Sequence, residues 1–188
     1  MDAALKVEKE LETTEPSSAI SLEVDGELYF DVIKGLMTFA RKQDAQLIYV
    51  AATVSASAIK QAMALIDVDA TGVRFIDCIS NLMTGSHNDT GDVIFIESPT
   101  MLESIMLKVE FIRKRSSGKQ VTVVLDSLNT LHIHNDWKIL GEFLHILVSG
   151  LKNRGAVIVI MSISEQQSQE LNALLGLVSD KSVKVGGQ

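Results

Sequence analysis

The chain has 188 residues, of which 46% are hydrophobic, 22% charged and 5% aromatic, a composition typical of one globular domain and not of a disordered chain. Its net charge of −7 disfavours binding to nucleic-acid phosphates or to anionic membranes. No apolar run approaches the roughly 18 residues that a membrane span needs. The acidic N-terminus also lacks the regions of a signal peptide, so we expect a soluble cytoplasmic protein.

Residues 1–18 are charged and weakly periodic, and they end at Pro16-Ser17-Ser18. We interpret them as a frayed helix or a flexible acidic N-terminal tail. From Ala19 onward, apolar strand-like runs alternate with amphipathic helical stretches. This alternation predicts an α/β fold, in which a mostly parallel sheet carries helices on both faces. Residues 19–188 therefore form one predicted domain with three layers, α/β/α.

Strands and helices can be assigned by their apolar spacing and by the turn residues between them. The predicted strands are 46–52, 73–78, 92–96, 121–126, 157–161 and 181–185, and the predicted helices are 30–42, 56–66, 98–115, 136–153 and 166–175. The helix over 98–115 is expected to start at an N-cap, Ser98, followed by Pro99. Continuous apolar runs at 121–125 and 157–161 indicate central strands that are covered on both faces.

The segment from Val121 to Asp126 has the form of a Walker B strand, with apolar residues that end in an acid. A parallel strand delivers its last carboxylate to the sheet edge where ligands of open α/β folds bind. There, Asp126 could hold Mg²⁺ directly or through water. Alternatively, Asp126 and Ser127 satisfy backbone donors of the loop that follows.

A working phosphate-binding loop needs a glycine-rich cradle with lysine and serine or threonine. The pattern G-x-x-x-x-G-K-[ST] is absent from the chain. Its one Gly-Lys pair, Gly118-Lys119, lacks the upstream glycine and follows a helix instead of a strand, so we interpret it as a surface turn.

The stretch from Gln46 to Val185 resembles the KaiC-like branch of the RecA superfamily, especially its small archaeal members. The passages that carry the resemblance are Leu47-Ile48-Tyr49-Val50, Phe75-Ile76-Asp77-Cys78-Ile79-Ser80, Ser98-Pro99, Val124-Leu125-Asp126-Ser127-Leu128-Asn129-Thr130-Leu131, Phe143-Leu144-His145, Leu151-Lys152-Asn153-Arg154-Gly155 and Val178-Ser179-Asp180-Lys181. The resemblance implies a RecA-like core that in active members binds ATP and magnesium.

In active relatives a catalytic glutamate follows the strand that corresponds to 46–52, and this chain has Ala51-Ala52-Thr53 there. The resemblance therefore implies a degenerate ATPase that does not hydrolyse ATP. Only Asp126, with Ser127, carries over as a vestigial Walker B segment, and it is the candidate cofactor-binding site. Without a P-loop we expect no bound cofactor, although ATP with magnesium stays possible.

Three further features have a functional and a structural interpretation. His132 and His134 lie on one side of a predicted extended segment and could begin a metal site with His145. The alternative is a polar loop in which Asn135 and Asp136 cap the next helix. Cys78 is interpreted as a buried structural thiol. A basic ring could receive an acidic partner or form a solvated helix end, and it comprises Lys108, Arg113, Lys114, Arg115 and Lys119.

These observations lead to the hypothesis of a non-catalytic RecA/KaiC-like domain that acts as a regulatory or protein-interaction module. We expect a protein partner or self-association, and neither nucleic acid nor membrane. The alternative is a nucleotide-binding protein or weak ATPase with an atypical site around Asp126. A third hypothesis, a metal enzyme, depends on His132 and His134.

Overall fold

The middle layer of the protein is a seven-stranded sheet in the order β4-β3-β2-β5-β6-β1-β7, and the computed structural model describes residues 2–187. All neighbouring strands are parallel, so the predicted α/β fold is confirmed. The strands are β1 (Ala19–Val24), β2 (Gln46–Ala51), β3 (Arg74–Asp77), β4 (Val93–Phe95), β5 (Val121–Asp126), β6 (Val157–Ile163) and β7 (Lys181–Val185). The apolar strands β5 and β6 lie in the middle of the sheet, as their sequences predicted.

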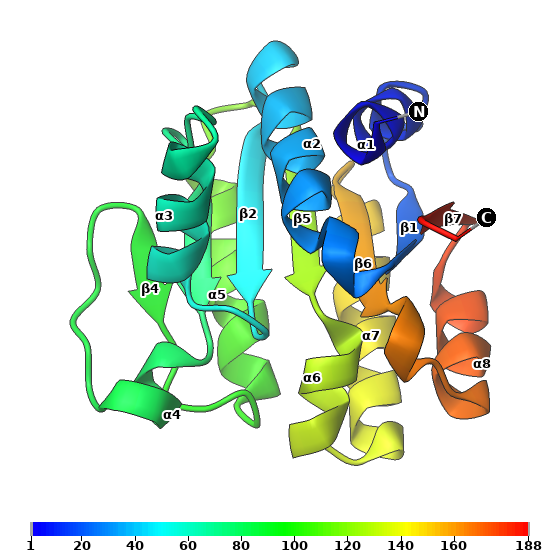
Figure 1. Cartoon of the computed structure of the whole chain (residues 1–188). Helices are drawn as coiled ribbons and strands as arrows, with labels where there is room; N and C mark the ends of the chain where they lie inside the picture. The colour runs from blue at the N-terminus through cyan, green and yellow to red at the C-terminus, as the bar shows by residue number, and fades with distance from the viewer. Residues whose placement is uncertain (1, 188) are drawn as a thin grey trace.

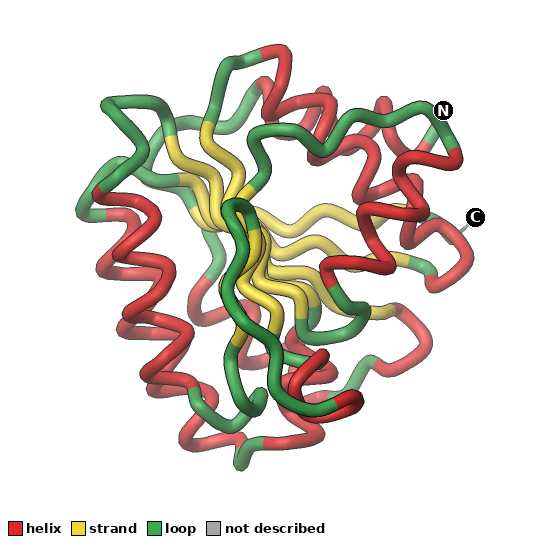
Figure 2. Tube along the Cα trace, turned by 90° about the vertical axis from the view of Figure 1, so that its left-hand side faces the viewer, coloured by secondary structure: helices red, strands yellow, loops and turns green. Residues whose placement is uncertain are grey.

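Helices cover both faces of this sheet, which gives the three predicted layers (Figures 1 and 2). One face carries α1 (Ala3–Glu12), α2 (Tyr29–Lys42) and α3 (Ala56–Leu65), and the other carries α5 (Leu102–Lys114), α7 (Trp137–Lys152) and α8 (Gln169–Val178). Two short helices, α4 (Ser80–Thr84) and α6 (Leu128–His134), lie beyond the carboxyl ends of the strands. Each face has its own apolar core.

Local capping explains several helix boundaries. Asp136 accepts a hydrogen bond from the backbone of Lys138 and caps α7, as predicted. Gly155 follows the end of α7 with φ of 79°, a conformation that favours glycine. The helix predicted from Ser98 begins only at Leu102, because Ser98 instead accepts from the backbone of Thr100 and stabilises a turn.

Residues 3–12, for which the sequence left a frayed helix or a flexible tail open, form a helix that packs on the domain. Apolar residues spaced for one helix face bury against α2, namely Ala3, Ala4, Val7 and Leu11. Gly35 of α2 permits the close crossing, since a Cβ there would lie 2.5 Å from the carbonyl oxygen of Ala4. Across residues 2–187, none of the helices is both long enough and apolar enough to cross a membrane.

Candidate functional site

The direction of the chain through the sheet reverses between β2 and β5. From β2 the chain continues outward to β3 and β4, whereas from β5 it continues to β6 on the other side. Open parallel sheets bind ligands beyond the carboxyl ends of strands at such a reversal. Asp126, the last residue of β5, lies there, opposite Ala51 at the end of β2. The structure therefore places the predicted site residue at the expected edge.

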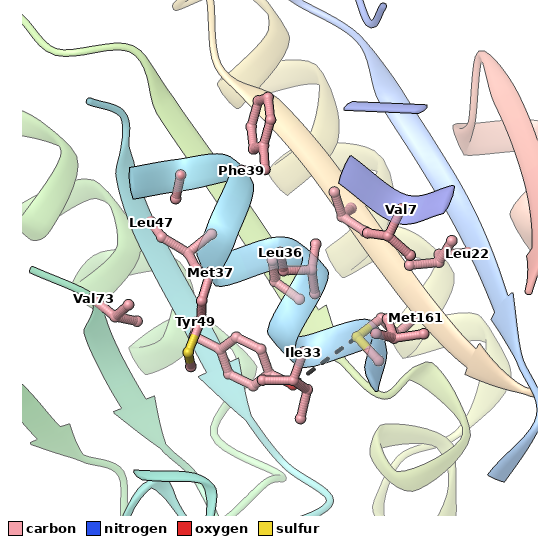
Figure 3. Close-up of a cluster of buried hydrophobic side chains, with 14 of the residues drawn as sticks. Val7, Leu22, Ile33, Leu36, Met37, Phe39, Leu47, Tyr49, Val73 and Met161 are labelled. Atoms are coloured by element: carbon pink, nitrogen blue, oxygen red, sulfur yellow. Dashed lines mark hydrogen bonds between the residues drawn. The ribbon is translucent and has the colours of Figure 1, made fainter. Parts of the chain in front are cut away.

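The carboxylate of Asp126 is fully buried and is bound by both tyrosines of the chain. The hydroxyl of Tyr49 donates to Oδ2 of Asp126 over 2.6 Å, and the hydroxyl of Tyr29 donates to the same oxygen. Tyr49 comes from β2 and lies beneath α2 beside Ile33 (Figure 3). Tyr29 is the first residue of α2. Within residues 2–187, Oδ1 of Asp126 has no hydrogen-bond partner.

Burial dominates the electrostatics of this cluster. It raises the pKa of Asp126 to about 6, although the hydrogen bonds from Tyr29 and Tyr49 act in the opposite direction. Burial also raises the pKa of both tyrosines, and the neighbouring carboxylate of Asp126 raises them further. Both phenols therefore stay protonated and act as donors to Asp126 at neutral pH.

A group of three hydroxyls lies next to Asp126. Oγ1 of Thr53 is 3.2 Å from Oγ of Ser127 and 3.0 Å from Oγ1 of Thr130. Ser127 also accepts from the backbone of Thr130 and thereby caps α6. The alternative interpretation therefore holds for Ser127, which accepts from a backbone N–H of the following segment, but not for Asp126, whose carboxylate accepts from two tyrosine hydroxyls. The Asp126–Ser127 peptide bond is cis.

The connection from β1 to α2 is a strand–loop–helix unit, and its helix begins with Tyr29, whose hydroxyl contacts Asp126. A P-loop occupies a unit of this kind. Here the connection is Asp25-Gly26-Glu27-Leu28, which has no lysine or hydroxyl and two acids. The backbone N–H of Gly26 donates to Oε1 of Glu165 over 3.0 Å. The protein's own carboxylate thus occupies a backbone donor that a bound anion could otherwise use.

These residues do not fit a magnesium triphosphate. Magnesium takes ionised, accessible oxygen ligands and several waters, but Oδ2 of Asp126 accepts two phenol hydrogen bonds in a fully buried position. Gly118-Lys119 lies at the amino end of β5, where Lys119 pairs with Asp44 over 2.6 Å, so it is a turn at the opposite edge of the sheet.

Sequence reasoning did not identify the tyrosines, Glu165 or the role of Asp77. Asp77 ends β3 and is fully buried. Its Oδ2 accepts from the backbone of Ala56 and its Oδ1 from those of Ile79 and Ser80, each within 3.0 Å, and Oδ2 also accepts from the Ser80 hydroxyl. Asp77 therefore fixes the start of α3 and the start of α4. A polar residue at the end of an apolar strand was the signal in the sequence.

The histidine pair lies on a helix and not on an extended segment. Ser127 caps α6, and Leu128 and Leu131 bury on its inner side. Because two positions on a helix are separated by about 200° of rotation, His132 and His134 leave α6 on nearly opposite sides. The His132 ring stacks on Trp137 with centroids 3.5 Å apart. No group of three side chains suited to a metal ion occurs among residues 2–187.

Cys78 is buried without a disulfide, as expected of a structural thiol. Burial, with a further contribution from Asp77, raises the pKa of its thiol, which opposes formation of the reactive thiolate.

The sequence matches no protein-family model and no curated protein. The fold, in contrast, matches solved structures. A KaiC-like protein from the hyperthermophilic archaeon Pyrococcus horikoshii OT3 superposes with a TM-score of 0.65 at 10% identity, over 90% of this chain and 71% of that chain. The flagellar accessory protein FlaH from Methanocaldococcus jannaschii gives a TM-score of 0.59 at 11% identity, with the same coverage of both chains. The chain therefore has the three-layer, RecA-like α/β fold of KaiC-like proteins.

Proposed function

We propose that this chain is a non-catalytic RecA-like domain that acts as a protein-interaction or regulatory module. The observation that carries the proposal is the closed cluster of Asp126, Tyr29 and Tyr49. It leaves the vestigial Walker B carboxylate buried and bound by two neutral phenols. The sites that flank the cluster support the same conclusion, because Ala52 and Thr53 stand where a catalytic base would be and Glu165 occupies the N–H of Gly26.

A protein-interaction role is supported by the outer surface of the helices. Several large apolar side chains lie exposed there, among them Leu107 and Phe111 on α5 and Ile139 and Ile146 on α7. Exposed apolar side chains that gather on one face are typical of protein contacts. The acidic net charge of −7 favours protein partners over nucleic acid or an anionic membrane.

The second candidate function is nucleotide binding at an atypical site around Asp126. The observation that favours it is the buried Oδ1 of Asp126, which has no hydrogen-bond partner within the described part of the chain. Buried polar atoms are normally paired, and an unmade bond at such an atom invites a ligand or a water.

Thermal unfolding with magnesium and ATP distinguishes the two candidates. A nucleotide at a hundredfold excess over its Kd stabilises a protein by about 2.7 kcal/mol, which raises the Tm of a domain of this size by about 5–10 °C. We expect a shift of about 1 °C or less for both the native chain and Asp126→Ala, and no phosphate release above a protein-free control. A large shift in the native chain that Asp126→Ala abolishes would establish the alternative function instead.

A further inference from the structure

The helices α5 and α7 leave an apolar groove between them on the outer face of the protein. Its volume is about 410 Å³, and it is lined by Met106, Leu107, Ile146 and Gly150 among others. Leu107 is 70% exposed and Ile146 is 59% exposed. Gly150 has no side chain to fill the space between the helices. Apolar surface of this kind gains free energy when a partner removes it from water.

The two helices run in the same direction, because each of them leads from the carboxyl edge of the sheet to the amino edge (Figure 1). The charge on these two helices changes from one end to the other, and Glu103, Glu110 and Arg154 line the groove itself. At the amino ends of the helices, three acids accompany one lysine, namely Glu103, Asp136, Glu142 and Lys138. At the carboxyl ends, five cations accompany one acid, namely Arg113, Lys114, Arg115, Lys152, Arg154 and Glu110, and Lys152 pairs with Asp180.

The basic end is organised by Glu110. Its carboxylate receives Arg113 over 2.7 Å and lies 3.5 Å from Nε of Arg154, which joins α5 to α7. Arg115 lies over the ring of Phe111 at 3.7 Å. After these contacts, the end still has an excess of positive charge, with Lys114 well exposed. Of the other two cations of the predicted basic ring, Lys108 and Lys119, the latter pairs elsewhere with Asp44.

We propose that this groove is the interface through which two copies of the chain form a dimer. A twofold axis through the middle of the groove would turn the partner's α5 and α7 antiparallel to the first pair. Each acidic end would then face a basic end, and the apolar centre around Leu107 and Ile146 would face its own copy. The surface is thus complementary to itself in both charge and apolar character. This inference rests on the proposed function as an interaction module and names its partner.

Sedimentation of the full chain tests the dimer. The monomer mass is 20.5 kDa, and we expect twice this mass at micromolar concentration. Ile146→Glu places a charge and its symmetry copy at the centre of the interface, and we expect the dimer Kd to rise at least about tenfold, the equivalent of 1.4 kcal/mol. The matched control is Leu177→Glu on α8, which changes a side chain that is 84% exposed outside the groove and should leave the mass unchanged.

Charge reversal gives a second test that does not alter the apolar centre. Glu103→Lys and Lys114→Glu should each weaken the dimer, and the double variant should restore it, because the two ends exchange their charges. High salt should weaken the native dimer. Circular dichroism and Tm confirm that every variant folds.

Two results would overturn the dimer. The first is a native chain that remains monomeric at about 100 µM, a concentration at which even a weak dimer forms. The second is a dimer that tolerates Ile146→Glu and both single charge reversals. Neither result bears on ATP, whereas a dimer that binds and hydrolyses ATP contradicts the proposed function and leaves the interface intact.

Discussion

Asp77 and Asp126 occupy equivalent positions and have opposite surroundings. Each ends a parallel strand, and each is fully buried. Four donors from the backbone and side chains of neighbouring segments surround Asp77. Two phenols converge on a single oxygen of Asp126 and leave the other without a partner in the described structure. The same residue type at the same edge thus fixes two helix starts in one case and accepts two tyrosine hydroxyls in the other.

The largest expected effect comes from removing the carboxylate of Asp77, which holds the starts of α3 and α4. Asp77→Ala leaves the N–H groups of Ala56, Ile79 and Ser80 without their acceptor, and we expect the free energy of unfolding to fall by about 4 kcal/mol. Chemical denaturation measures this free energy of unfolding. The matched control is Asp92→Ala, which removes an exposed ion pair with Lys60 and should cost less than about 1 kcal/mol. Equal losses in both variants would mean that Asp77 does not hold the helix starts.

The next effect is a pH dependence that belongs to Asp126. Its pKa is about 6 in the folded protein and about 3.9 in an unfolded chain, so the folded state binds the extra proton between these values. The stability that Asp126 contributes is therefore complete below about pH 4 and is lost as the pH rises through 6, a change of about 3 kcal/mol. Because other acids titrate in the same range, the measured quantity is the difference in unfolding free energy between the native chain and Asp126→Asn. A difference that stays flat from pH 4 to pH 7 would contradict the raised pKa.

A smaller effect tests the phenols. Tyr49→Phe removes one donor from the ionised carboxylate of Asp126, and we expect a loss of about 2 kcal/mol at pH 8 and a smaller loss at pH 5, where the carboxyl is largely neutral. In an Asp126→Asn background the same substitution should cost less than about 1 kcal/mol. This double-mutant cycle isolates the pair, and equal costs in both backgrounds would show that the hydroxyl acts through packing alone.

The contrast between the two aspartates also marks what the sequence could predict. Unbroken apolar runs identified β5 and β6 because a buried parallel strand requires them, and the acid after β5 followed from the same pattern. The sequence left open whether residues 1–18 are a frayed helix or a flexible tail, because the apolar face of α1 includes two small alanines among charged residues. The helix α6 was not predicted because two histidines obscure the spacing of Leu128 and Leu131.

The residues that contact Asp126 could not be predicted, because they lie far from it along the chain. Tyr29 and Tyr49 lie 97 and 77 positions before Asp126, and a single sequence gives no sign that they meet. Each tyrosine alone is compatible with an ordinary core position. The link between Glu165 and Gly26 spans 139 positions and was hidden for the same reason. Only the strand order brings these residues together.

That strand order also has a consequence for how the chain folds as it is made. The four strands β2 to β5 are neighbours in the sheet, so their pairing requires only the first 126 residues. The first strand, β1, pairs with β6 and β7 alone, and the last of these ends at Val185. During synthesis, β1 therefore has no strand partner until β6, which ends at Ile163, has been made.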